Sequence, residues 1–97
     1  MSIRERWAAA FWRMMAAMLR AKAQRHADKA VDAFAQCIAA YAERDMDDGA
    51  RWLARGERHA DAAQAFGEIE AKAMRYAAED EPPMPAQNVW PSVEWRA

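Results

Sequence analysis

The stretch IRERWAAAFWRMMAAMLRAKAQRHADKAVDAFAQCIAAYAERDMDD, residues 3–48, contains neither glycine nor proline. These two residues disfavour a helix interior most strongly, so their absence over such a length predicts one long helix. Ser2 and Glu5 match a capping box, in which the Ser2 hydroxyl accepts from the Glu5 amide and the Glu5 carboxylate accepts from the Ser2 amide. We therefore expect a helix from about residue 3 to about residue 44.

A cluster of acids separates this helix from a second one. Residues 45–49 contain three aspartates and a glycine, and we expect the chain to turn there, with Asp47 or Asp48 capping the next helix. That helix should run over about residues 50–80 and stop before Pro82 and Pro83. The predicted fold is all-α: a long antiparallel helical hairpin over residues 1–80, followed by an extended C-terminal tail. The tail, residues 81–97, contains proline and tryptophan and should pack on the hairpin or on a partner.

Large apolar residues at helical spacing indicate the face that each helix should bury. In the first helix this face holds Trp7, Phe11, Met14, Met15, Met18 and Leu19, with Trp12 at its margin, and continues through Val31, Phe34, Ile38 and Tyr41. In the second helix it holds Trp52, His59, Ala63, Phe66, Ile69, Ala73 and Tyr76.

Composition and charge favour a small protein-binding domain. The 97 residues suffice for one domain, and 26 of them are alanine, which has little surface to bury. The larger apolar residues include seven methionines and five tryptophans but only two leucines, and surfaces rich in methionine and tryptophan suit partner binding. The net charge is −1 but is divided into +5 over residues 1–29 and −6 over the rest. Such a division favours attraction between the helices over a general affinity for nucleic acid.

Cellular location is indicated only by weak signals. Cys37 is the only cysteine, so no intramolecular disulfide is possible and we expect a cytoplasmic protein. Residues 7–19 are the most apolar stretch, but Arg13 interrupts them and they are too short to cross a membrane. An amphipathic helix that lies on a membrane surface is an alternative that the sequence does not exclude.

No motif predicts catalysis, a cofactor or a metal. The sequence RHAD occurs at residues 25–28 and again at 58–61, and includes both histidines. His26 and Asp28 are two residues apart, as are His59 and Asp61, a spacing that points side chains to different sides of a helix. We therefore expect no metal site, no cofactor and no enzyme activity, with the repeat being either a weak duplication or a coincidence.

The aromatic end of the hairpin is the best candidate for partner binding. A turn near Asp47 would pair residues whose numbers add up to about 95, so that Trp7, Phe11 and Trp12 project past the end of the second helix. Either the tail folds back to cover these rings with its own two tryptophans, or a second copy does so in a four-helix bundle. The predicted partner-binding residues are Trp7, Phe11, Trp12, Met15, Trp90 and Trp95.

The predicted function is that of a non-enzymatic protein-binding module, a small regulator or inhibitor that occupies a partner surface and forms a homodimer. In size, methionine and tryptophan content and lack of catalytic signatures the chain resembles, in general character only, small phage-encoded inhibitors such as anti-CRISPR proteins. The alternative is a nucleic-acid-binding protein, because clustered cations bind phosphate and an indole can stack on a base. Its residues would be Arg6, Arg13, Arg20, Arg51, Trp52, Arg55 and Arg58.

Overall fold

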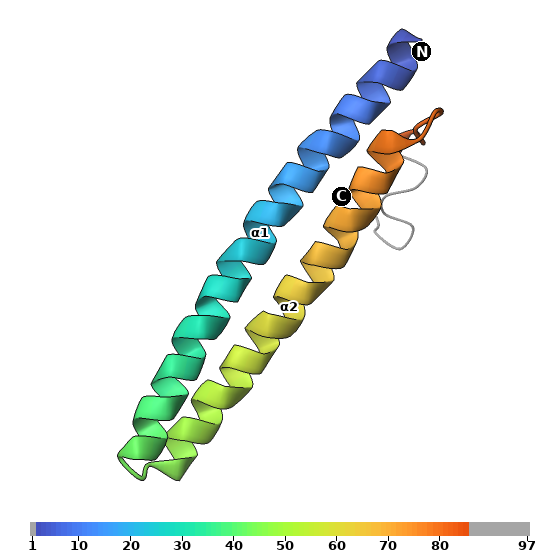
Figure 1. Cartoon of the computed structure of the whole chain (residues 1–97). Helices are drawn as coiled ribbons and strands as arrows, with labels where there is room; N and C mark the ends of the chain where they lie inside the picture. Colours follow the sequence, from blue (N-terminus) through green and yellow to red (C-terminus); the bar gives the residue numbers. More distant parts are fainter. Residues whose placement is uncertain (1, 86–97) are drawn as a thin grey trace, which may run out of the picture.

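The computed structural model describes residues 2–85, which form two long helices packed side by side as an antiparallel hairpin (Figure 1). Helix α1 spans Ile3–Ala42 and helix α2 spans Met46–Ala78. The prediction of an all-α helical hairpin is confirmed. Of the tail, residues 81–85 belong to the described part, and the Pro83 carbonyl contacts Trp12 of α1.

The start of α1 is the capping box that the sequence predicts. The Glu5 amide donates to Ser2 Oγ at 3.1 Å, and the Ser2 amide donates to Glu5 Oε1 at 2.9 Å. The bond from the Ser2 amide also lowers the pKa of the Glu5 carboxyl, because it stabilises the charged form. Two of the amides that a helix start leaves without partners are thereby satisfied.

The turn between the helices lies earlier than the sequence suggests. Helix α1 ends at Ala42, the Glu43 amide still bonds back to the carbonyls of Ala39 and Ala40, and Arg44 takes a left-handed backbone conformation with φ 64°. Asp45 then caps α2 by accepting from the Asp48 amide at 3.1 Å. The prediction that Asp47 or Asp48 is the cap is wrong; both lie in the first turn of α2, where the helix dipole also favours carboxylates.

The two helices pack along a seam in which small residues predominate. On α1 the seam follows steps of three and four residues through Ala9, Trp12, Ala16, Leu19, Ala23, His26, Ala30, Ala33, Cys37 and Ala40, eight of them buried and two half-buried. On α2 it follows Gly49, Trp52, Gly56, His59, Ala63, Phe66, Glu70, Ala73 and Ala77. Alternating steps of three and four residues form the seven-residue repeat of a coiled coil. The small residues of the seam let the helix backbones approach closely.

The predicted buried face of α1 is therefore largely wrong. Leu19 is buried, but Trp7, Met14, Met18, Val31 and Ile38 are all exposed. Most seam positions on α1 are alanines, so most of the large side chains of α1 lie outside the seam. On α2 the predicted face is correct except for Ile69, which is exposed.

Aromatic rings of α1 lie over glycines of α2 near the turn. A Cβ atom on Gly49 would collide with the Tyr41 ring, and one on Gly56 would lie 2.5 Å from Phe34 Cε1. Each ring therefore occupies space that only glycine leaves open. Seven-residue steps from these pairs lead to half-buried Ala27 and Ala63, and then to Arg20 and Glu70, whose side chains form an ion pair at 2.9 Å.

Candidate partner-binding surface

One side of α1 carries large apolar side chains that stay exposed or half-buried when the two helices pack. Positions midway between the seam residues point away from α2, and near the start of α1 they hold Ile3, Trp7, Ala10, Phe11, Met14, Ala17 and Met18. We call these residues the outer face. Ile3 is 81% exposed, Trp7 57%, and Met14 and Met18 each 53%. The first half of α1 is thus apolar on two sides, the seam and the outer face.

The outer face contains a shallow apolar depression. It is lined by Trp7, Ala10, Phe11 and Met14 and has a volume of about 210 Å³. The Trp7 ring stacks on the Phe11 ring with centroids 5.8 Å apart, and Phe11 meets the edge of Trp12 at 5.4 Å. The exposed Trp7 ring therefore packs on half-buried Phe11, which in turn packs on buried Trp12.

Trp12, predicted to project past the end of the second helix, is instead part of the hydrophobic core between the helices. Its side chain is 2% exposed and packs with Ala16, Leu19 and Ala73. The Trp12 ring lies 4.7 Å from the Tyr76 ring, and its indole Nε1 donates to the carbonyl oxygen of Pro83 at 2.8 Å. The reason is the early position of the turn. Residues that face each other across the helices have numbers that add up to about 90, as in the pair of Arg20 and Glu70. Trp12 therefore lies opposite the last turn of α2.

The other predicted partner residues are placed as follows. Trp7 is exposed, while Phe11 and Met15 are half-buried. Trp90 and Trp95 lie outside the described residues. The start of the tail does fold back on the hairpin, since Pro82 is buried and Pro83 accepts the Trp12 hydrogen bond. The sequence analysis placed Met14 and Met18 on the buried face. Met14 follows Trp7 by seven residues, so these two side chains lie on the same side of α1.

The arginines of the nucleic-acid alternative are partly engaged within the hairpin. Arg20 pairs with Glu70 at 2.9 Å, and Arg51 pairs with Asp48 at 3.0 Å. The Arg55 guanidinium lies 4.9 Å from the centre of the Trp52 ring, so it covers a ring that would otherwise stack on a base. Arg6, Arg13 and Arg58 are exposed.

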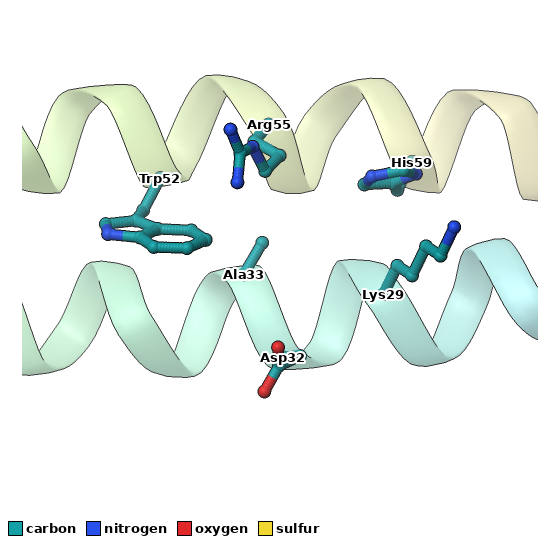
Figure 2. Close-up of a pocket in the computed structure, with 6 residues that line it drawn as sticks. All are labelled: Lys29, Asp32, Ala33, Trp52, Arg55 and His59. Atoms are coloured by element: carbon teal, nitrogen blue, oxygen red, sulfur yellow. The ribbon is translucent and has the colours of Figure 1, made fainter.

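A second groove lies between the helices in the half of the hairpin nearer the turn (Figure 2). It has a volume of about 310 Å³ and is lined by Lys29, Asp32, Ala33, Trp52, Arg55 and His59. Figure 2 shows Lys29 reaching from α1 toward His59, whereas Asp32 points away from α2. The groove is basic on its α2 side, but its indole is already occupied by Arg55.

The repeated RHAD segments meet across the seam. His26 Nδ1 and His59 Nδ1 are 3.0 Å apart, which is a hydrogen bond when one ring carries its proton on Nδ1 and the other does not. His26 also stacks on Phe66 with centroids 5.6 Å apart. Within residues 2–85, no three His, Cys, Asp or Glu side chains are grouped so as to hold a metal ion.

The histidine pair should make the hairpin sensitive to mild acid. Burial lowers the pKa of His59, and the positive charges of His26, Lys29, Arg55 and Arg58 lower it further. A lowered pKa means that the unfolded chain takes up a proton first, so this stabilisation is complete above the ordinary pKa of about 6.5 and is lost as the pH falls through the folded value.

We expect the melting temperature of the wild type to fall between pH 7 and pH 5, and that of His59→Leu to fall less over the same interval. Circular dichroism melts at matched ionic strength measure both. Equal pH dependence in the two proteins would contradict this interpretation.

Comparisons with known proteins give no relatives: no protein family, curated protein or solved structure matches the chain. Neither described helix has an apolar stretch long enough to cross a membrane.

Proposed function

We propose that the chain is a non-enzymatic protein-binding module that receives its partner on the outer face of α1. The observation that carries the proposal is the exposure of Trp7, Met14 and Met18 side by side on a helix whose other apolar side is already packed. Apolar surface in water costs about 25 cal/mol per Å², and a contiguous exposed apolar patch marks an interaction site.

The composition of the outer face supports protein recognition. Tryptophan and methionine are enriched at the centres of protein interfaces. The Trp7 ring is held by Phe11, so little side-chain freedom is lost when a partner packs against it. A chain of 97 residues with such a face suits a small regulator or inhibitor that acts by covering a surface of its target. A cytoplasmic location and a homodimer stay predictions.

Met14→Glu should abolish partner binding without unfolding the hairpin. The new carboxylate would have to be buried in the centre of the outer face, which costs several kcal/mol. In the free protein Met14 is exposed, so helicity and melting temperature should change little. The measurement is affinity capture from the source cell in high salt, with titration calorimetry against the purified captured protein.

Val31→Glu is the matched control, because Val31 is also an exposed apolar residue of α1, at 69%, but lies outside the outer face. It should retain the partner. A partner captured equally by the wild type, Met14→Glu and Val31→Glu would refute the assignment of this face. Salt-sensitive retention of single-stranded DNA by all three proteins, in place of a protein partner, would support the nucleic-acid alternative.

A further inference from the structure

The charges around the outer face indicate what kind of partner it fits. We propose that the partner presents an amphipathic helix whose apolar stripe is bordered by aspartate and glutamate. This inference rests on the function proposed above, since it concerns the same face, and it adds the shape and charge of the occupant.

The shape of the outer face suits a helix. Trp7 and Met14 form one row of side chains seven residues apart, and Phe11 and Met18 form a second row. Ala10 and Ala17 are small residues beside the first row, and the depression of about 210 Å³ lies among Trp7, Ala10, Phe11 and Met14. Alternating large and small side chains at this spacing receive the ridges of another helix, as the seam side of α1 does with α2.

The border of the outer face is basic. Arg4, Arg6, Arg13 and Arg25 are all exposed, and the six basic residues between 3 and 25 face only one acid, Glu5. The Glu5 carboxylate accepts the Ser2 amide and so belongs to the helix cap. Charges at the rim of an interface select partners of opposite sign and repel those of the same sign.

The second half of α2 and the residues just after it provide an example within the molecule of the charge that α1 accepts. The part of the chain that packs beside the basic half of α1, residues 60–81, has six acids against Lys72 and Arg75. One of these acids, Glu70, forms the ion pair with Arg20. A second copy offering its own α1 would instead bring the same six bases, so like charges oppose pairing of two outer faces.

The test uses the full chain and two labelled synthetic helical peptides of about 20 residues, long enough to cover the outer face. Both peptides share one leucine and alanine stripe; one is flanked by glutamate and the other by lysine. Fluorescence anisotropy measures binding at low and high salt. Vesicles of phosphatidylcholine and phosphatidylglycerol form a third arm, which tests an anionic lipid surface as the occupant.

We expect the glutamate peptide to bind about tenfold more tightly than the lysine peptide, a preference that several rim ion pairs of ordinary strength supply. Arg4→Gln with Arg25→Gln should reduce that preference, Arg75→Gln on α2 should leave it unchanged, and Met14→Glu should abolish binding.

Three results would overturn the proposal: equal binding of both peptides, binding of neither, or binding of vesicles alone. Equal binding that Met14→Glu still abolishes would remove the acidic partner and leave the protein-binding function intact. The function itself fails only when capture of a protein is indifferent to Met14→Glu.

Discussion

Replacing Trp12 with alanine should lower the free energy of unfolding by about 3–5 kcal/mol, the usual cost of deleting a large aromatic side chain from a core. Trp12 is buried among Ala16, Leu19 and Ala73, and its indole satisfies the Pro83 carbonyl. The loss would therefore combine a cavity with an unsatisfied acceptor.

Trp7→Ala is the control, since it removes the same side chain five residues earlier. Trp7 is more than half exposed, so its removal should cost less than about 1 kcal/mol. Urea titrations followed by circular dichroism give both values. Similar losses for the two variants would mean that the sides of α1 are not divided as described, with Trp12 in the core and Trp7 on the outer face.

Gly56→Ala should destabilise the hairpin, although alanine is the better helix former. A Cβ atom at this position would lie 2.5 Å from Phe34 Cε1 and 2.6 Å from Cδ1, so the ring must leave its place against α2. Overpacking of this kind costs about 1–3 kcal/mol. Gly67→Ala should instead stabilise the hairpin, because no atom lies within 4 Å of the new Cβ. The expected gain is about 0.5–1 kcal/mol, since alanine loses less backbone freedom than glycine when the chain folds.

A double-mutant cycle identifies the cause of the Gly56 effect. In a Phe34→Ala background the clash is absent, so Gly56→Ala should no longer destabilise the protein. Thermal unfolding of the four proteins in the cycle provides the coupling energy. A loss that persists without the Phe34 ring would contradict the steric explanation.

The helices and the first cap could be predicted because their signals are local. Residues 3–48 lack helix breakers, and Ser2 and Glu5 stand at the spacing that a capping box requires. The turn was harder to place, since three aspartates lie within four residues and each can serve as a cap. The structure uses the first of them, Asp45.

The packing of α1 could not be predicted from its large residues, because its first half has two apolar sides. Periodicity among Trp7, Met14 and Met18 is real, but it marks the outer face. The seam is instead carried by alanines, and alanine is so frequent in this chain that its spacing attracts little notice. A count of small residues at seven-residue steps, such as Ala9, Ala16 and Ala23, would have found the seam.

The candidate surface was predicted only in part, because the sequence did not show which apolar side of α1 faces α2. Trp7 and Phe11 were predicted as partner contacts and lie on the outer face, whereas Trp12 belongs to the core. The signal for the histidine pair was present in the repeat of RHAD, whose two copies lie on opposite sides of the turn. Without the position of the turn, the repeat could not show that His26 faces His59.

The pairing of rings with glycines determines how the two helices align along their length. An alanine seam alone would tolerate many alignments, because one alanine replaces another without loss. Moving α2 by seven residues in one direction would place Phe34 over Ala63, whose methyl group occupies the space that Gly56 leaves empty; moving it in the other would leave Gly56 opposite Ala27, with a void between them. Tyr41 and Phe34 thus restrict the alanine-rich seam to a single alignment of α2 along α1.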